Sequence, residues 1–408
     1  MLDDYDHRAI GARMGLFHLQ EEAPGMVFWH PRGWTLFRLV EGYVRDCLLA
    51  HGYEEVKTPQ VIARSIWEES GHWQNFRDGM LTIDDGERAF ALKPVNCPGH
   101  VQLFKRGIRS YRELPLRLAE FGGCHRNESR GVLHGLMRVR GFVQDDGHVF
   151  CREDQIDGEI VAFCALLRAA YAAFGFRDEV EVKLSTRPAV RAGSDEVWDR
   201  AEAAIAAAAR AAGLRPELQP GEGAFYGPKL EFALRDAHGR AWQCGTIQLD
   251  LVLPERFDAQ YVAPSGGRSR PVMLHRAILG SLERFVGILL EHHRGALPAW
   301  LAPEQVVVAS IAEAHREHAA RAVAALRARG LRAVLDDRPE TLGRKVAEAH
   351  QHGAPYLWAI GAREAAAGAV AVRGPGGGQQ TLPLAAALDA LERAAARPEI
   401  PPAAEAAA

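Results

Sequence analysis

The 408-residue sequence predicts an α+β protein in which an antiparallel sheet flanked by helices is followed by a small α/β domain. Three observations predict this class. Residues 121–150 have the pattern of strand, polar loop and strand. Residues 230–235 and 241–250 alternate polar and apolar side chains on either side of a glycine-containing turn, which is typical of a β-hairpin. After residue 303, short apolar segments alternate with amphipathic segments, which is the βαβ rhythm of a small α/β domain.

Composition and charge limit the classes of function. Hydrophobic residues make up 48% of the sequence and charged residues 25%, ordinary values for a globular protein with large cores. The net charge of -3 provides no global basic field, so any RNA contact has to rest on local patches. The six cysteines include no Cys-x-x-Cys pair, which argues against a zinc ribbon or a disulfide framework. With no signal-peptide pattern and no apolar run of membrane-spanning length, we expect a cytoplasmic protein without membrane contact.

A leading helix, a polar loop, a second helix and two short strands are expected before residue 100. The second helix rests on apolar residues at helical spacing from Leu36 to Leu48, and Gly52 would end it. The leading helix is expected over residues 8–19, the polar loop over 20–30, the second helix over 34–51 and the two strands over 54–58 and 89–93. The last strand leads into Pro94-Val-Asn-Cys-Pro-Gly-His100, where two prolines constrain the turn that holds Cys97. A free cysteine is usually a small core residue, and the residues alone favour that interpretation.

Helices and strands also alternate from residue 153 on. Helices are expected over residues 153–175 and over the alanine-rich residues 194–213. A strand over residues 271–275 is expected to lead directly into a long helix that begins at Arg276. In the C-terminal part, strands are expected over residues 306–311, 332–335, 356–360 and 370–373, with helices that end at residue 329, begin at residue 341 and end at residue 395.

The side chains of residues 121–150 suit a nucleotide. Guanidinium groups pair with phosphate oxygens, an aromatic ring stacks on a base, and carboxylate or imidazole groups hold an amine or a metal. The segment supplies these groups at Arg126, Glu128, Arg138, Phe142, Asp146 and His148. A charged surface hairpin would have a similar composition, so the residues alone leave both interpretations open.

The same segment resembles a known family. His125-Arg-Asn-Glu128, His134-Gly-Leu-Met-Arg-Val-Arg140 and Phe142-Val-Gln-Asp-Asp-Gly-His148 together resemble the second signature motif of class II aminoacyl-tRNA synthetases, in their threonyl form. Residues 34–59 resemble the first motif, which builds the dimer interface in that family, and residues 271–285 resemble the third. The resemblance implies a homodimer and four segments: a helix and linker over residues 1–30, a class II catalytic domain over 31–297, an α/β anticodon-binding domain over 303–397 and a disordered tail over 398–408.

The resemblance also implies roles for individual residues. ATP would be bound, with Mg²⁺ bridging its phosphates, by Arg126, Glu128, Arg138, Phe142, Gln243, Thr246 and Arg284. L-Threonine would be surrounded by Gln144, Asp146, Tyr226, Lys229, Cys244 and Gln248. The catalytic groups would be Arg126, Lys229, Arg284 and His72, with His72 as the base that acts on the terminal ribose of tRNA. On the residues alone, His72 beside Trp73 would be structural.

A metal site is implied by the resemblance only. Cys97, His148 and His275 lie far apart in the sequence and have no local metal signature, so the residues alone favour ordinary buried side chains. The family matches imply that these three residues bind Zn²⁺, with a fourth position left for the substrate. A site that must hold the threonine hydroxyl can reject valine strongly, whereas serine lacks only one methyl group, a difference worth about 10- to 200-fold.

The implied function is ATP-dependent formation of threonyl-adenylate and its transfer to tRNA(Thr), the reaction of a threonine-tRNA ligase. Because the sequence begins close to Asp6, we expect that this chain has no proofreading domain and forms detectable seryl-tRNA, or that it is a truncated product. Glu364 and Arg373 match residues that read anticodon bases in the family, whereas Pro339, Gly353 and the glycine-rich residues 374–379 depart from it. These departures leave open a threonine-activating paralogue that loads a carrier protein and, less favoured, a non-catalytic regulatory module.

Overall fold

The computed structural model of this chain describes residues 3–177 and 180–402, which form two compact units. The larger unit is built from residues 19–27 and 41–288, and the smaller from residues up to 18, 28–40 and 289–399. Within the described ranges, no helix has both the length and the apolar character that crossing a membrane requires. The tail that was expected to be disordered lies outside the described residues from position 403 on.

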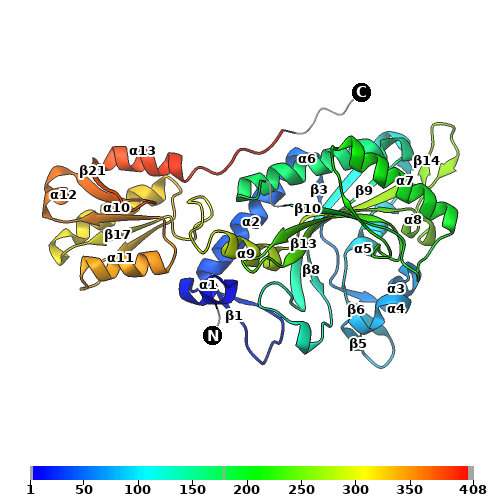
Figure 1. Ribbon diagram of the computed structural model, residues 1–408, viewed down its shortest axis with the longest axis horizontal. Coiled ribbons are helices and arrows are strands. Elements are labelled where there is room, and N and C mark those ends of the chain that lie inside the picture. The colour runs from blue at the N-terminus through cyan, green and yellow to red at the C-terminus, as the bar shows by residue number, and fades with distance from the viewer. Residues whose placement is uncertain (1–2, 178–179, 403–408) are drawn as a thin grey trace. The chain divides into compact units, whose positions relative to one another are not determined.

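An eight-stranded sheet forms the centre of the larger unit, in the order β11-β10-β12-β13-β16-β9-β8-β3 (Figure 1). All neighbours pair antiparallel except the two edge pairs, β10 with β11 and β3 with β8. The predicted antiparallel sheet is therefore confirmed. Its strands are β3 (Glu54–Glu55), β8 (Leu116–His125), β9 (Gly141–Cys151), β10 (Glu181–Ser185), β11 (Glu217–Gln219), β12 (Lys229–Arg235), β13 (Ala241–Asp250) and β16 (Val272–Ser281).

Helices cover both faces of this sheet (Figure 1). On one side, α6 (Ile156–Phe174) and α7 (Asp195–Ala211) pack against each other and against β12, β13 and β16. The side chain of Ser194 caps α7 by accepting a hydrogen bond from the Val197 N–H. On the other side lie α3 (Arg64–Ser70), α4 (His72–Phe76), α5 (Cys97–Phe104) and α8 (Leu253–Arg256). Two three-stranded sheets complete the unit: β4 (Val61–Ala63), β6 (Ala89–Leu92) and β5 (Thr82–Asp84), and β15 (Arg268–Ser269), β14 (Tyr261–Val262) and β7 (Arg109–Ser110).

The smaller unit contains a five-stranded sheet in the order β18-β17-β19-β20-β21. Its first three strands are parallel and its last two antiparallel, and the core includes Val308, Leu326, Trp358 and Val370. The predicted α/β domain is thus confirmed. Its elements are β17 (Val306–Ser310), α10 (Arg316–Ala328), β18 (Ala333–Asp336), α11 (Leu342–Gln351), β19 (Tyr356–Ile360), α12 (Ala362–Ala367), β20 (Ala369–Arg373), β21 (Gln379–Pro383) and α13 (Leu384–Ala394). The other α-helices and strands of the described residues are α1 (His7–Met14), β1 (Phe17–His18), β2 (Phe28–Trp29), α2 (Pro31–Ala50) and α9 (Leu282–His292).

Two predicted helices were wrong in their bounds. The leading helix ends at Met14 rather than at residue 19, because Gly15 adopts a left-handed conformation at φ 66° and Phe17 then pairs with Trp29 in a short hairpin. The long helix begins at Leu282, not at Arg276, because β16 continues to Ser281. The apolar run within residues 277–279 suits either element, and the side chain of Asp145 decides between them.

The carboxylate of Asp145 accepts hydrogen bonds from the backbone N–H groups of Ile278, Leu279 and Gly280, at 2.7–3.0 Å. It takes the place of a strand partner where the register with β9 shifts, between Ala277 and Ser281.

A further correction concerns Cys97. It lies not in a turn but at the first position of α5, where Pro98 follows it without the loss of a helical hydrogen bond.

Candidate active site

Strand alternation places most of the expected site residues on one face of the central sheet. Successive side chains of a strand point to opposite faces, so Gln144, Asp146 and His148 share a face of β9. The strand register then joins distant parts of the sequence, because His148 is the partner of His275 and His275 is the partner of Gln248. The antiparallel sheet therefore aligns β9, β16 and β13 in one row of polar groups.

A cavity of about 270 Å³ opens on this face. All seven residues that were expected to bind ATP line it, together with four of the six expected to surround threonine. The first set is Arg126, Glu128, Arg138, Phe142, Gln243, Thr246 and Arg284, and the second is Gln144, Lys229, Cys244 and Gln248. Met137, Val139, Gly280 and Ser281 also line the cavity and were not among the expected residues. Gly280 and Ser281 were missed because the end of β16 was expected to be helical.

Cationic groups dominate the electrostatics of this cavity. Arg126 donates to the carbonyl oxygen of Pro94 at 3.3 Å, and its guanidinium lies 5.2 Å from the centre of the Phe142 ring. Arg284 donates to the carbonyl oxygens of Met137 and Gln243 at 2.8 and 2.6 Å. Since both arginines bond to backbone carbonyls rather than to carboxylates, their positive charges are available to an anion.

The other charged side chains of the cavity form ion pairs. Lys229 Nζ lies 2.8 Å from a carboxylate oxygen of Glu231, the next residue but one on β12. Arg138 Nε donates to Glu128 Oε2 at 3.1 Å. Burial raises the pKa of the Cys244 thiol to about 12, so this side chain lines the cavity as a neutral group.

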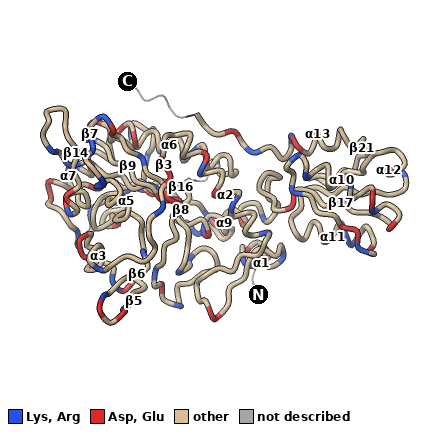
Figure 2. The backbone as a smooth tube through the Cα atoms, turned by 180° about the vertical axis from the view of Figure 1, so that it is seen from behind, with Lys and Arg blue, Asp and Glu red and all other residues tan. Residues whose placement is uncertain are grey.

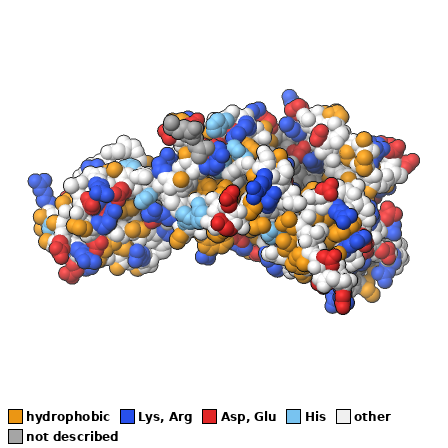
Figure 3. All heavy atoms as spheres, turned by 90° about the horizontal axis from the view of Figure 1, so that it is seen from below, with side chains coloured by type: hydrophobic (Ala, Val, Ile, Leu, Met, Phe, Trp, Pro, Cys, Tyr) orange, Lys and Arg blue, Asp and Glu red, His pale blue; other side chains and the backbone are white. Residues whose placement is uncertain are grey.

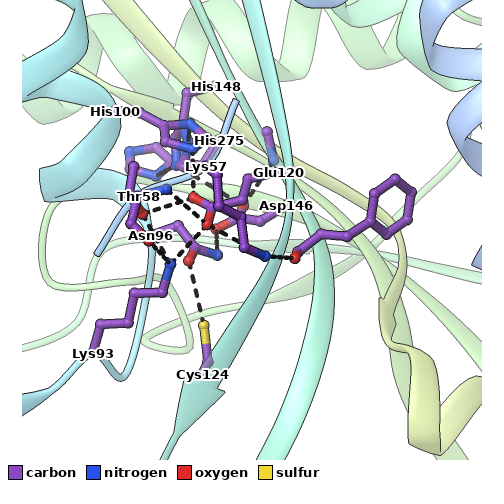
Figure 4. A network of polar contacts seen from close by, with 12 residues as sticks. Lys57, Thr58, Lys93, Asn96, His100, Glu120, Cys124, Asp146, His148 and His275 are labelled. Carbon is purple, nitrogen blue, oxygen red and sulfur yellow. Dashed lines mark hydrogen bonds and ion pairs between the residues drawn. The ribbon is translucent and has the colours of Figure 1, made fainter. Parts of the chain in front are cut away.

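Cys97, His148 and His275 meet beside the cavity. Their candidate ligand atoms all lie within 4.8 Å of one another, and all three residues are buried. They come from three elements: the start of α5, the middle of β9 and the middle of β16. Nε2 of His148 is 3.0 Å from Nδ1 of His275, and Figure 4 shows the two rings with His100 close by.

The chemistry of this donor set fits a zinc ion. Nε2 of His275 is 2.8 Å from Oδ2 of Asp250, whose other oxygen accepts from the N–H groups of Val252 and Leu253. A carboxylate only accepts, so the His275 proton lies on Nε2 and the lone pair on Nδ1 faces the site. Burial, followed by nearby His100 and His275, holds the pKa of His148 well below its usual value, which favours the neutral imidazole that binds metals. A thiolate and two imidazoles leave a fourth position of a tetrahedral ion open.

Tyr226 connects the donor set with the cavity. Its hydroxyl donates to Oε1 of Gln248 at 2.8 Å, and its ring stacks on that of His275, with centroids 4.9 Å apart. Asp146 lies in the same row and accepts from Nδ2 of Asn96 at 2.9 Å. Tyr226 and Asp146, which were expected to contact threonine, are thus beside the histidines rather than in the wall of the cavity.

His72 is the first residue of α4 and is buried. Its Nδ1 lies 2.9 Å from the hydroxyl oxygen of Ser70, and its ring is 5.5 Å from that of Phe225 and 6.4 Å from that of Tyr226. Burial is the main cause that lowers the pKa of His72 to about 3, so the imidazole is neutral near pH 7. The structure therefore places His72 close to the donor set, as a neutral group.

Sequence patterns gave no sign of a second buried network next to the donor set. Lys93 Nζ donates to Oε1 of Glu120 and to Oγ1 of Thr58, both at 2.8 Å, and His100 Nε2 lies 3.1 Å from Oε2 of Glu120. Burial raises the pKa of Glu120, but the hydrogen bonds from His100, Lys93 and Thr58 outweigh it and lower the pKa to about 2. Because its members are distant in the sequence, no local motif could have revealed this network.

The two residues expected to read an anticodon lie at different ends of β19. Glu364 follows its C-terminal end, where the carboxylate caps α12 by accepting from the Gly361 N–H at 3.0 Å. Arg373 pairs across the sheet with Leu357 near the beginning of β19 and donates to the side chain of Gln379 at 2.9 Å. The structure thus does not bring these two residues together.

Comparisons with known proteins agree with this architecture. Residues 80–293 match the family "tRNA synthetase class II core domain (G, H, P, S and T)" and residues 305–394 match "Anticodon binding domain". The chain is 61% identical over 371 residues to a threonine–tRNA ligase of Cupriavidus pinatubonensis and 58% identical over 372 residues to one of Burkholderia mallei. Each match covers 91% of this chain but 58% of the relative, so the chain spans less than two thirds of their length.

A solved structure matches over almost its whole length. It is the crystal structure of the RNA binding domain of threonyl-tRNA synthetase from Cryptosporidium parvum, which superimposes with a TM-score of 0.92 at 39% sequence identity. The match covers 97% of this chain and 99% of that chain.

Proposed function

We propose a function for this chain on the premise that it belongs to the threonyl-tRNA synthetase family of class II aminoacyl-tRNA synthetases. The proposed function is the ATP-dependent activation of L-threonine to threonyl-adenylate, followed by transfer of the threonyl group to tRNA(Thr). One observation carries the proposal: the cationic cavity and the Cys97, His148 and His275 donor set lie side by side, joined through Gln248 and Tyr226.

In the first step, a carboxylate oxygen of threonine attacks the α-phosphorus of ATP, and the bond from that phosphorus to the bridging oxygen of diphosphate breaks. Both reactants are anions, so the barrier falls when fixed cations lie where they meet. Arg126 and Lys229 would neutralise the threonine carboxylate and the α-phosphate, and Arg284 the departing diphosphate. The ring of Phe142 would stack on adenine, whose amino group would donate to Glu128.

Arg138, Gln243 and Thr246 would supply further contacts to the nucleotide. Mg²⁺ is proposed to arrive with ATP. Of the described residues that line the cavity, Glu128 is the sole carboxylate, and it is paired with Arg138. Hard cations take oxygen ligands, so most of the oxygen atoms around Mg²⁺ would come from phosphates and water.

Zinc is proposed to be held by Sγ of Cys97, Nε2 of His148 and Nδ1 of His275. When bound, it supplies a Lewis-acidic position for the amino and hydroxyl groups of threonine. The Asp146 carboxylate would accept a hydrogen bond from the amino group, and Gln144, Tyr226, Gln248 and Cys244 would enclose the side chain. Valine would leave the position for the hydroxyl unfilled, whereas serine would fill it and lose only the contacts of one methyl group.

In the second step, a hydroxyl of the terminal ribose of tRNA attacks the threonyl carbonyl carbon, and the bond to the AMP oxygen breaks. His72 is proposed to take the hydroxyl proton, because its neutral imidazole can accept one near pH 7. We further propose a cytoplasmic homodimer, in which α2 and β3 contribute to the interface as the first motif does in the family.

Exchange of labelled diphosphate into ATP tests the proposal. The exchange should depend on threonine, be at the background level with valine, and proceed with serine at about 10- to 200-fold lower kcat/KM. Metal analysis of the same sample should find one zinc ion per chain. Exchange without threonine dependence, or valine used as well as threonine, would contradict the proposal.

A second candidate function is threonine activation followed by loading of another acceptor, such as a carrier protein. It is favoured by the separation of Glu364 and Arg373 and by the use of Glu364 as a helix cap. Charging of purified tRNA(Thr) with labelled threonine separates the two candidates. A chain that catalyses exchange yet charges no tRNA would favour the second. If threonine-dependent exchange is also absent, the regulatory module gains support.

A further inference from the structure

A buried row of polar side chains extends from His148 away from the cavity. Nδ1 of His148 is 2.8 Å from Nδ1 of His100, whose Nε2 is 3.1 Å from Oε2 of Glu120. Lys93 Nζ lies 2.8 Å from the other oxygen of Glu120, and the hydroxyl of Thr58 donates to Oε2 at 2.8 Å. His100, Glu120 and Lys93 are all 0% exposed, and Figure 4 shows the dashed lines that lead from one side chain to the next.

The positions of the protons along this row follow from the fact that a nitrogen atom that binds a metal must have a free lone pair. If His148 binds a cation through Nε2, that nitrogen carries no proton and its proton lies on Nδ1. The His148 Nδ1–H then donates to Nδ1 of His100, so the proton of neutral His100 lies on Nε2. That N–H donates in turn to Glu120, a carboxylate that only accepts. Each contact therefore has one donor and one acceptor, provided that Glu120 is ionised and Nε2 of His148 carries no proton.

We propose that His100, Glu120 and Lys93 are positioning residues that fix His148 in the tautomer with a lone pair on Nε2, and thereby set the affinity of the Cys97, His148 and His275 site for zinc. The two histidines are held differently. Asp250 holds His275 directly, whereas Glu120 acts on His148 through the ring of His100. The inference rests on the proposed zinc site and not on the choice of amino acid.

Lys93 has a defined part in this arrangement. A buried carboxylate without a cation tends to take up a proton, because burial disfavours its charge. A protonated Glu120 could donate to Nε2 of His100, which would reverse the order of donors and place a proton on Nε2 of His148. The ammonium of Lys93, at 2.8 Å, keeps Glu120 an acceptor. Lys93 thus acts on a metal ligand through two intervening side chains.

Zinc affinity of the full chain tests the proposal. The chain is freed of metal and titrated with Zn²⁺ in competition with a chromophoric chelator, and the ligand geometry is read from the visible spectrum of the Co²⁺ form. His100→Leu removes the acceptor and keeps much of the volume, and we expect its Kd for zinc to rise about 10- to 100-fold. His100→Asn carries an amide oxygen at the same distance from Cβ as Nδ1, so it should recover most of the lost affinity.

A matched pair of lysine variants provides the control. Lys93→Met should raise the Kd for zinc, whereas Lys345→Met should not. Lys345 is also buried, at 1% exposure, but its ammonium donates to the carbonyl oxygens of Ser310 and Asp336 in the smaller unit. Both substitutions remove a buried ammonium, so a general loss of stability would affect the two variants alike. Urea unfolding of the metal-free chains reports that loss.

Each outcome decides the question. Wild-type zinc affinity in His100→Leu, or an affinity in His100→Asn as low as in His100→Leu, would overturn the proposal. If His100→Leu does not fold, an equal Kd for Lys93→Met and Lys345→Met overturns it. A wild-type chain that binds no zinc would overturn both the metal site and the role of the positioning residues. If the wild-type chain binds zinc and the variants have the expected order of zinc affinities, but threonine supports no diphosphate exchange, the role of the positioning residues holds and the proposed substrate is refuted.

Discussion

At the scale of single residues, Glu283 gives the chain a defined pH dependence of stability. This side chain is 4% exposed, and burial, the main cause, raises its pKa to about 7 against the opposing hydrogen bonds from Ser281 and Val143. A carboxyl group whose pKa is higher in the folded state stabilises that state fully below its unfolded pKa of about 4.3 and loses this contribution as the pH rises through 7. The slope is at most about 1.4 kcal/mol per pH unit.

Glu283→Gln removes this titration and keeps an oxygen that can accept a hydrogen bond. Relative to the wild type, we expect the variant to gain stability between pH 5 and pH 8.5, as measured by urea unfolding at both values. Some pH dependence should remain, because burial also raises the pKa of Asp145 to about 7. A variant whose stability changes with pH as steeply as that of the wild type would contradict the assignment.

The sequence predicted those residues of the candidate site that share a short motif, and it missed residues whose partners are far away in the sequence. Arg126, Glu128 and Phe142 belong to one short motif, and the strand register brings them to one cavity as expected. The proposed zinc ligands Cys97, His148 and His275 have no local pattern, so only resemblance to a family could suggest them. His100 and Glu120 were not found at all, because hydrogen bonds between residues that are 20 positions apart leave no trace in composition or periodicity.

At the scale of elements, the boundary between β16 and α9 shapes the cavity, because Gly280, Ser281 and Arg284 line it. Gly280 lies at this boundary with φ 73°, and a Cβ atom there would meet the carbonyl oxygen of Cys244 at 2.6 Å. We expect Gly280→Ala to destabilise the fold by roughly 1–3 kcal/mol. An alanine would be strained at this positive φ, and the carbonyl group of Cys244, which is part of β13, cannot move away from the added Cβ atom. The substitution should also lower threonine-dependent exchange, since Ser281 and Arg284 follow directly. Unfolding by urea and the exchange assay measure the two effects.

Gly239→Ala is the control for this substitution. Gly239 has a similar φ of 76° in the turn between β12 and β13, but a Cβ atom there would meet nothing within 4 Å. The control should therefore show only the backbone cost, about 1 kcal/mol, and unchanged exchange. Equal effects of the two substitutions would show that the contact with Cys244 is unimportant.

Elements were predicted well where the sequence marks their ends, and poorly where it does not. The bounds of β13 were predicted correctly because a glycine-containing turn precedes its start and polar and apolar side chains alternate from Thr246 to its end at Asp250. The end of β16 was placed too early because apolar residues 277–279 fit a helix as well as a strand, and the carboxylate that decides between them, Asp145, lies more than 130 residues away. The edge strand β11 and its neighbour β10 were missed because they are short and partly polar, so their periodicity is weak.

At the scale of the whole molecule, charge sets how a nucleic acid can bind. The net charge of -3 gives no attraction at long range, and both signs are interspersed along the chain and over the face shown in Figure 3 (Figures 2 and 3). If the chain binds tRNA, its affinity has to come from individual contacts, so single substitutions would have measurable effects and moderate salt would weaken binding. The proposed adenylate step would need no such contact, since the cavity proposed for it lies entirely in the larger unit.

This separation gives a prediction for the smaller unit. If tRNA is the acceptor, Arg373→Ala should raise the KM for tRNA by about 5- to 100-fold, the loss expected for one specific contact, while threonine-dependent exchange stays unchanged. Arg393→Ala is the matched control, because it removes the same charge from the exposed surface of α13 in the same unit. Glu364 is better tested as Glu364→Gln, which can still cap α12. Charging kinetics in which Arg373→Ala and Arg393→Ala behave alike would remove Arg373 from the tRNA interface and favour an acceptor that the smaller unit recognises by other residues.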